Sequence, residues 1–523
     1  MTGVDMNQID TRSMASASGV AVTLDALHGG ARTARATAVP LSAEALAVAA
    51  KPAPAPISPI VLAGLVRMVE FALIVAVGLA IFLVYIPGED ALHWRYAGAT
   101  LAIAVLSILA FQIADVYQVQ AFRGHEKQYM RLASAWSIVF LMVIGATFFA
   151  KIGEWYSRVW LSTFYFAGLT SLIVSRKILF HLVRQWTRQG RLTRRTVIVG
   201  GGEAGSAVIN ELNRQDDSDV EVIGLFDDRG DERAGIECAG KRKLGTVDHL
   251  VEFGRRTRVD LVIFSLPISA EGRILQMLKK LWVLPVDIRL AAHSNKLQFR
   301  PRCYSYIGSV PVLDLFDRPI ADWDVVMKWL FDKIIGSLIL LAALPVMAAI
   351  AVAIKLDSRG PVLFKQRRYG FNNDLIEVFK FRSMYVDASD ASANTLVTKD
   401  DPRVTRIGRI IRKASIDELP QLFNVVLKGN LSLVGPRPHA INAKAEARLY
   451  AEAVDGYFAR HRVKPGITGW AQINGWRGET DTDEKIQKRV EHDLYYIENW
   501  SFAFDVKILV LTFFALLRAD NAY

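Results

Sequence analysis

Long apolar stretches constrain the fold of this chain more than any other feature of its sequence. Four of them, at residues 61–86, 96–115, 132–150 and 157–175, approach the roughly 20 residues that a helix needs to cross a bilayer. The links between them are short and polar. They predict a membrane protein with a compact four-helix transmembrane bundle over residues 58–175.

A fifth apolar stretch carries Pro345 in its middle. Proline lacks a backbone donor and clashes with the preceding turn, so it breaks or kinks a helix. Basic side chains flank the stretch on both sides, whereas positive charge favours the cytoplasmic face. A segment that enters, breaks at Pro345 and returns keeps both basic groups inside. We therefore expect a re-entrant membrane helix over residues 323–356, with a plain crossing as the alternative.

Charge and composition indicate where the remaining segments lie. Residues 1–57 are rich in Ala, Ser, Thr and Pro without a sustained period, which is typical of a disordered segment. A run of basic residues without any acid extends from Arg176 to Arg195, directly after the fourth span. The run places the chain after residue 175 in the cytoplasm, and four crossings return the N-terminus to the same side.

The formal net charge of +11 suits nucleic acid, an anionic membrane face or anionic substrates. Basic blocks interleaved with Phe379, Phe381 and Trp470 would serve a nucleic acid. Four membrane spans argue against that as the main role, so we expect no nucleic-acid partner.

Residues 176–322 change to a βαβ rhythm. Gly200, Gly202 and Gly205 lie between the first strand pattern and a helical stretch. Glycines at such a turn leave backbone amides free for a phosphate, and Asp227 falls near the place of a ribose-binding acid. The pattern predicts a Rossmann-like domain. It leaves open whether these four residues bind a ligand or whether the domain is structural or regulatory.

Residues 357–523 hold basic blocks that favour a polyanionic substrate. Arginine presents a planar fork that matches phosphate oxygens, and lysine presents a point charge. Asp417 and Glu418 form an adjacent pair of carboxylates inside these blocks. Beside Arg412 and Lys413 they should stay ionised, able to bind Mg²⁺ or to attack phosphorus.

Helix capping is the alternative explanation for this carboxylate pair. Ser415 lies three residues before Glu418, which is the spacing of a capping box, and acids favour helix N-termini. The spacing alone therefore leaves a structural role and a catalytic role open.

Five sequence blocks follow one another in this part of the chain: KFRSM, DPRVTRIG, RKASIDELPQL, LVGPRPH and KPGITGWAQINGWRGET. In this order they resemble the bacterial sugar transferase family, whose members are polyprenyl-phosphate hexose-1-phosphate transferases that initiate exopolysaccharide, capsule or O-antigen synthesis. The four spans and the middle domain resemble the large members of that family. One departure is Asn373, where many members have glycine, but asparagine also tolerates left-handed turns.

The resemblance implies a mainly helical, monotopic catalytic domain over residues 357–523, on the cytoplasmic side of the bacterial inner membrane. It implies UDP-hexose, with glucose as the first choice, and polyprenyl phosphate as substrates, and Mg²⁺ as the cofactor. Asp417 would attack the sugar-bearing phosphorus and expel UMP, and Glu418 would assist with metal or proton handling, so that both could ligate the metal. Asp332 would anchor the fold.

The resemblance also implies six further substrate contacts. Phosphates would be held by Lys380, Arg382, Arg412 and Arg437, and the nucleotide-sugar would be contacted by Gln472 and Asn474.

A membrane-anchored nucleotide-sugar dehydratase is the main rival hypothesis, because such enzymes also join four spans to a Rossmann-like domain. They need a tyrosine followed four residues later by a lysine, and the sequence contains no such pair. A non-catalytic scaffold of a polysaccharide assembly is a third hypothesis, which leaves the arginine set unexplained. A homodimer through the middle domain is a further expectation.

Overall fold

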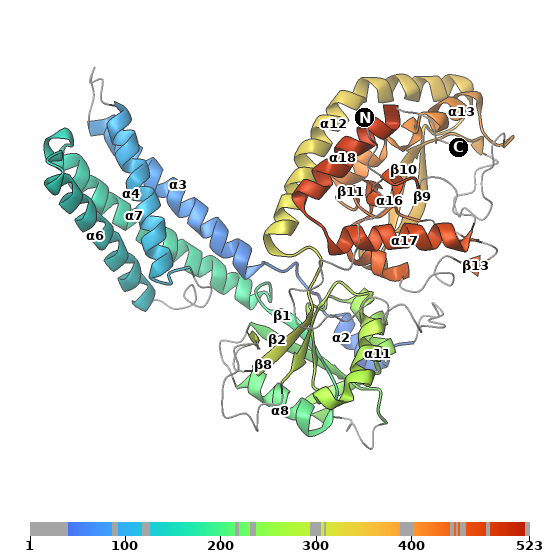
Figure 1. The fold of residues 1–523 in the computed structure, drawn as a ribbon, viewed down its shortest axis with the longest axis horizontal. Coiled ribbons are helices and arrows are strands. Elements are labelled where there is room, and N and C mark those ends of the chain that lie inside the picture. Colours follow the sequence, from blue (N-terminus) through green and yellow to red (C-terminus); the bar gives the residue numbers. More distant parts are fainter. Residues whose placement is uncertain are drawn as a thin grey trace, which may run out of the picture.

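The computed structural model describes residues 40–85, 93–117, 126–214, 219–230, 237–292, 305–307, 310–386, 401–439, 444–445, 448–449, 457–476 and 482–517. Within them the chain forms a helical bundle, a domain built on a mixed sheet, and a C-terminal domain bordered by one long helix (Figure 1).

Four long helices form the bundle. They are α3 (Pro59–Tyr85), α4 (His93–Ile113), α6 (Glu126–Phe149) and α7 (Arg158–Arg188), with the short η1 (Gly153–Trp155) before the last. Each is long and apolar enough to cross a membrane, which supports a membrane protein, and each coincides with one predicted stretch. Because α7 continues past residue 175, the first part of the predicted middle domain belongs to this helix instead.

One buried ion pair joins the first and last helices of the bundle. Arg176 Nε lies 2.6 Å from Glu70 Oε1, and Tyr117 donates its hydroxyl proton to Glu70 Oε2 at 2.9 Å. Buried charges are tolerated when they are paired and hydrogen-bonded. The pair therefore ties α7 to α3 at one height.

An ordered segment precedes the bundle. The helix α2 (Ala43–Ala49) packs apolar side chains into the core of the middle domain, and Ser42 Oγ donates to Leu244 O at 3.1 Å. The prediction of disorder over residues 1–57 is therefore wrong for residues 40–57, and the earlier residues lie outside the described part. A helix this short depends on tertiary contacts, so its own sequence gives a weak signal.

The middle domain is built on an eight-stranded sheet in the order β3-β4-β2-β1-β5-β6-β8-β7. The strands β4, β2, β1, β5 and β6 run parallel, and β3, β8 and β7 pair antiparallel with their neighbours. Their bounds are β1 (Arg194–Val199), β2 (Val220–Phe226), β3 (Glu237–Cys238), β4 (Lys241–Gly245), β5 (Leu261–Phe264), β6 (Asp287–Ala291), β7 (Ser305–Ile307) and β8 (Val310–Phe316).

Helices cover both faces of this sheet. They are α8 (Gly202–Asn213), α10 (Val247–Arg256) and α11 (Glu271–Leu281), the last preceded by η2 (Ile268–Ala270). Along β1, Val197 and Val199 enter the core formed with α10 and α11, whereas Ile198 enters the core formed with α8. Successive strand residues point to opposite faces, so the run of apolar residues in β1 serves two cores. The mostly parallel, doubly covered sheet confirms a Rossmann-like domain.

The C-terminal domain is mainly helical around small sheets. Its first elements are α12 (Asp322–Asp357), β9 (Leu363–Tyr369), η4 (Phe371–Asn373), β10 (Leu375–Phe381), α13 (Arg406–Lys413), η6 (Ile416–Glu418), α14 (Gln421–Phe423) and η7 (Asn424–Lys428). The remaining elements are β11 (Ser432–Val434), β12 (Lys444–Ala445), β13 (Arg448–Leu449), η8 (Tyr457–Arg462), β14 (Gly466–Thr468), α16 (Trp470–Ile473), α17 (Asp483–Glu498) and α18 (Phe502–Leu517). One apolar core joins α12, α17 and α18 to the β9–β10 hairpin and η7.

The long helix α12 passes Pro345 without ending and curves along one side of the C-terminal domain (Figure 1). The predicted break at Pro345 is therefore wrong. The backbone is helical on both sides of Pro345, so the proline is accommodated within the helix and does not terminate it.

The helix α12 is fastened to the C-terminal domain at two positions. In the first third of the helix, Asp332 Oδ1 accepts hydrogen bonds from Ser432 Oγ and Leu433 N, both at 2.9 Å. At its end, Arg382 Nη2 donates to the Ser358 carbonyl at 2.7 Å. Between these positions, Leu340, Met347 and Ile354 of α12 join the apolar core of the same domain, so the helix lies against it over most of its length.

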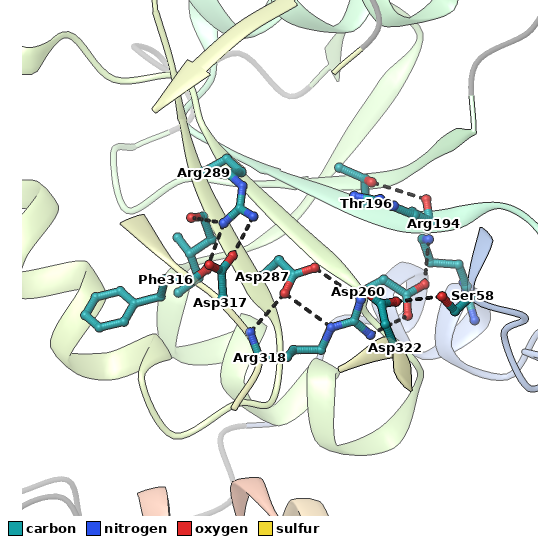
Figure 2. Close-up of polar contacts among 12 residues, drawn as sticks. Ser58, Arg194, Thr196, Asp260, Asp287, Arg289, Phe316, Asp317, Arg318 and Asp322 are labelled. Atoms are coloured by element: carbon teal, nitrogen blue, oxygen red, sulfur yellow. Dashed lines mark hydrogen bonds and ion pairs between the residues drawn. The ribbon is translucent and has the colours of Figure 1, made fainter. Parts of the chain in front are cut away.

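The three parts of the chain meet at a polar junction (Figure 2). Ser58 Oγ donates to Asp322 Oδ1 at 2.6 Å, which joins the start of α3 to the start of α12. Arg318 donates to both oxygens of Asp287, at 3.2 and 3.1 Å, and lies 3.8 Å from Asp260. The segment between β8 and α12 is thereby held against the middle sheet.

Candidate active site

Three separate segments bring four charged side chains together. Lys380 comes from β10, the carboxylate pair comes from η6, and Arg437 comes from the loop after β11. Lys380 Nζ lies 2.8 Å from Glu418 Oε1 and 4.0 Å from Asp417 Oδ2. Arg437 holds Glu418 with both terminal nitrogens, Nη1 at 3.1 Å from Oε2. The four side chains are between 14% and 25% exposed, so the cluster is accessible but only partly solvated.

The turn that carries the carboxylate pair is not a capping box. Ser415 has a φ of 55° and its side chain makes no capping hydrogen bond to η6. The Glu418 carboxylate is directed at Lys380 and Arg437 instead. The capping explanation is therefore wrong for Glu418, and its side chain belongs to the charged cluster.

A buried asparagine sets the position of the strand that carries Lys380. Asn424 Oδ1 accepts the Phe379 N–H at 2.9 Å, and its Nδ2 donates to the Glu377 carbonyl at 2.6 Å and to Asn430 Oδ1 at 3.1 Å. Asn424 is fully buried. Because a buried polar group is stable only when hydrogen-bonded, this clamp fixes β10 one residue before Lys380.

A buried network supports Arg437 from behind. Arg460 Nη2 donates to the Arg437 carbonyl and to Asp493 Oδ2, both at 2.6 Å. His439 contacts Arg460, and its Nδ1 lies 2.8 Å from the Tyr457 hydroxyl. Burial and the charge of Arg460 hold the pKa of His439 well below its usual range. The ring is therefore neutral and serves the network as a hydrogen-bonding group.

The two adjacent carboxyl groups differ in their electrostatics. Burial raises the pKa of Glu418, but Arg437 and Lys380 outweigh burial and hold that pKa well below its usual range. Burial raises the pKa of Asp417 above its usual value; Lys380 opposes this and the charge of Glu418 adds to it. We predicted that neighbouring cations keep both carboxylates ionised by lowering their pKa. This lowering is seen for Glu418, whereas for Asp417 the effect of burial on the pKa is larger.

Arg412 and Arg382, the other two predicted phosphate-binding residues, have surroundings that differ from those of Lys380 and Arg437. Arg412 lies in the last turn of α13, and its charge acts on Asp417 by lowering the carboxyl pKa. Arg382 is buried, and its guanidinium donates to the carbonyls of Ser358 and Arg359, both at 2.7 Å. Arg382 therefore anchors the end of α12 and shows no ion pair with Asp417 or Glu418 among the described residues, and phosphate binding by it stays a prediction.

Both predicted nucleotide-sugar contacts belong to the short α16 segment. Gln472 lies within the helix, and Asn474 at its end donates to the Trp470 carbonyl at 2.8 Å. Gly469, which precedes the helix, lies so close to Gly435 that a Cβ there would stand 2.3 Å from its carbonyl oxygen. The segment therefore borders the loop that carries Arg437, and contact with a nucleotide-sugar stays a prediction.

Sequence reasoning missed Arg368. It lies on β9, opposite Ile376 of β10, and it donates to the Pro438 carbonyl and to Gln366 Oε1. Burial and the charge of Arg437 lower the pKa of Arg368 to about 10. The sequence FKQRRYG at residues 364–370 could have indicated this residue. Side chains alternate between the two faces of a strand, so that Arg367 is exposed and Arg368 points inward.

The carboxylate pair is the part of this cluster that suits a divalent cation. In the described residues no group of three or more His, Cys, Asp or Glu side chains gathers. Mg²⁺ is typically bound through one or two carboxylates together with substrate phosphates. Asp417 and Glu418 therefore fit a Mg²⁺ ion that arrives with a phosphorylated substrate, and not one enclosed by protein ligands.

The glycine pattern of the middle domain is explained by packing. Gly200 and Gly202 have φ of 105° and 79°, which favour glycine, and a Cβ on Gly205 would stand 2.5 Å from the Gly200 carbonyl oxygen. Asp227 accepts the N–H of residue 201 and pairs with Arg229, both at 2.7 Å. The carboxylate of Asp227 is therefore engaged by the chain itself, and ligand binding by these residues stays a prediction.

Fold and site together define a class of protein: a membrane-attached domain with a carboxylate pair inside a set of phosphate-type cations. Residues 323–519 match the family described as bacterial sugar transferase, and residues 112–292 match the family described as CoA-binding domain. The chain belongs to the bacterial sugar transferase family.

Three similar proteins cover most of the chain. A Xanthomonas campestris pv. campestris protein named UDP-glucose:undecaprenyl-phosphate glucose-1-phosphate transferase is 35% identical over 87% of this chain and 94% of its own length. An Escherichia coli (strain K12) protein of the same name is 36% identical over 81% of this chain and 90% of its own. A Komagataeibacter xylinus protein named undecaprenyl-phosphate glucose phosphotransferase is 42% identical over 67% of this chain and 64% of its own.

Proposed function

We propose that this protein transfers glucose 1-phosphate from UDP-glucose to undecaprenyl phosphate and releases UMP, as the initiating step of exopolysaccharide or related glycan synthesis. The names of the similar proteins support the sugar and the lipid acceptor. The proposed chemistry rests on a difference between the two carboxylates. Glu418 pairs closely with Lys380 and Arg437, whereas Asp417 lies 4.0 Å from Lys380 Nζ.

Asp417 is the nucleophile in this proposal. Among the described residues its one ion pair is with Lys380, at 4.0 Å, so its oxygens stay available. The carboxylate attacks the phosphorus that bears the sugar, and UMP leaves with the bridging oxygen, which gives a sugar-phosphoryl aspartate. An oxygen of undecaprenyl phosphate then attacks the same phosphorus and releases Asp417 as a carboxylate.

Glu418 acts as the counter-ion that prepares the cations. It holds Lys380 and Arg437 in fixed positions before substrate binds. Cations placed in advance stabilise the negative charge that shifts onto phosphate oxygens in the transition state, without reorganising at that moment. Arg368 adds a third positive charge at the same place. Mg²⁺, bound through the two carboxylates and the diphosphate, would supply further neutralisation of phosphate charge.

We place the catalytic domain on the cytoplasmic side of the bacterial inner membrane. The docking of α2 on the middle domain puts the chain before α3 and the chain after α7 on one side, as an even number of crossings requires, and the basic run from Arg176 to Arg195 favours the cytoplasm for that side. The attachment of α12 to one domain at Asp332 and again at Ser358 supports a re-entrant helix. Labelling of single cysteines placed between residues 357 and 386 from outside intact cells would contradict this topology.

The product nucleotide tests the reaction directly. Purified protein with Mg²⁺, undecaprenyl phosphate and UDP-glucose should release UMP, and a panel of other UDP-sugars should release less. Release of UDP would identify a glycosyl transferase and contradict the proposal. A sugar-phosphate adduct, trapped without the lipid acceptor, should be absent from Asp417→Asn.

A further inference from the structure

The C-terminal end of α10, in the middle domain, touches the catalytic domain at two points. The Gly254 carbonyl accepts a hydrogen bond from Asn372 Nδ2 at 2.9 Å. The guanidinium of the next residue, Arg255, lies over the Phe458 ring at 5.2 Å from its centre. The Arg255 side chain is only 23% exposed, so the contact excludes much of the solvent around it.

The first contact holds the tip of the hairpin that reaches the active site. Asn372 lies in η4, the turn between β9 and β10, and the two strands are paired along their whole length, from Leu375↔Tyr369 to Phe381↔Leu363. The hairpin carries two active-site cations, Arg368 on one strand and Lys380 on the other. Because the paired strands move as one unit, a fixed tip limits the tilt of both cations.

The second contact holds η8. Arg255 packs on Phe458 of this helix, and Arg460, two residues on, donates to the Arg437 carbonyl at 2.6 Å. The ring of His461 also lies against Tyr369 at the end of β9, 5.8 Å between centres. The hairpin and η8 therefore contact each other as well as α10. The hairpin carries Lys380, and η8 carries Arg460, which holds the backbone of Arg437.

The other end of α10 is fixed within its own domain. Asp228 Oδ1 accepts the Val247 N–H at 2.8 Å, and Thr246 and His249 form a capping box at the N-terminus of the helix. A helix of 10 residues is about 15 Å long and rigid on this scale. A displacement of the middle sheet would therefore displace the contacts that α10 makes with the catalytic domain.

We propose that Arg255 and Asn372 are positioning residues of the transferase reaction, through which α10 of the middle domain holds Lys380 and Arg437 at the carboxylate pair. The proposal rests on the proposed function. It assigns to the middle domain a direct part in preparing the active site, independent of any ligand of its own.

Steady-state kinetics of the full-length protein in detergent or lipid nanodiscs test the proposal. Arg255→Ala and Asn372→Asp should each lower kcat for UMP release roughly tenfold or more, because displaced cations act on the transition state, while KM for UDP-glucose changes less than about twofold. Aspartate tolerates the φ of 52° at this position but removes the donor to Gly254. Arg255→Lys keeps a cation over Phe458 and should recover part of the lost rate.

Arg256→Ala is the matched control. Arg256 follows Arg255 on α10, is 44% exposed, and pairs with Glu252 of the same helix at 2.8 Å. It should leave kcat unchanged. Wild-type kcat per folded molecule in Arg255→Ala and Asn372→Asp would overturn the proposal, as would an equal loss in Arg256→Ala.

Hydrogen exchange separates this proposal from the proposed function. Amides of β10 and η8 should exchange faster in Arg255→Ala than in wild type, and at the wild-type rate in Arg256→Ala. This readout needs no turnover, so faster exchange would uphold the support by α10 even if the wild-type protein released no UMP. Unchanged exchange in an active wild-type protein would refute the proposal and leave the proposed function standing.

Discussion

Removing one charge from either carboxylate of the pair should separate chemistry from stability. The pKa of Asp417 is raised in the folded state, so its ionised form is favoured less there than in the unfolded chain. Asp417→Asn should therefore keep or raise the thermal stability near pH 7 while abolishing UMP release. Glu418 has the opposite shift, and its carboxylate is 14% exposed between Lys380 and Arg437. Glu418→Gln leaves these cations without their full counter-charge.

The size of the second effect follows from this burial. Breaking a buried ion pair costs about 3–5 kcal/mol, and we expect roughly 3 kcal/mol because the amide oxygen still accepts a hydrogen bond. For a domain of 150–250 residues this corresponds to a Tm lower by about 6–12 °C. Thermal unfolding of the purified variants, with UMP release measured on the same samples, is the assay. An equal fall in Tm for both variants, or none for Glu418→Gln, would refute the division of roles.

Three further predictions concern the surroundings of the pair. Asn424→Ala leaves the Phe379 N–H and a backbone carbonyl without partners and should cost roughly 3 kcal/mol or more; a loss below about 1 kcal/mol in thermal unfolding would contradict the clamp. Burial and the charges of Arg460 and Arg255 hold the pKa of His461 well below 6.5, so the unfolded chain binds more protons and stability falls as pH decreases below 6.5. His461→Phe should flatten this dependence by up to about 1.4 kcal/mol per pH unit; an unchanged slope would argue against it. EDTA should stop UMP release and excess Mg²⁺ should restore it, whereas activity retained in EDTA would exclude the proposed cofactor.

The sequence predicts best those features that follow from a local pattern of residues. The membrane helices follow from the length of their apolar stretches, and the Rossmann-like domain follows from its alternating strand and helix patterns with glycines at the first turn. Lys380, Arg437 and the carboxylate pair are predicted as site residues because their blocks have the residue types that phosphate chemistry needs. Their common location depends on turns, such as the left-handed Ser415, which residue type does not predict.

The features that the sequence did not predict share a physical cause: they depend on backbone groups or on segments distant in the chain. Arg382 lies in a phosphate-type block, yet its acceptors are carbonyls 23 and 24 residues earlier in the chain. Arg368 and Arg367 are equivalent in composition and differ only in the face of β9 that they occupy. Pro345 predicts a helix break from local rules, yet α12 continues through it and is held to the C-terminal domain on both sides of the proline.

The docking of α2 also constrains how the protein is made. Ser42 and its partner Leu244 are 202 residues apart, and all four helices of the bundle are synthesised between them. At roughly 5–20 residues per second, this interval lasts about 10–40 s. During that time the α2 segment has no docking surface and is open to chaperones and proteases. Its docking on β4 and α10 is therefore a late event, which follows the synthesis of all four bundle helices and the folding of the middle domain.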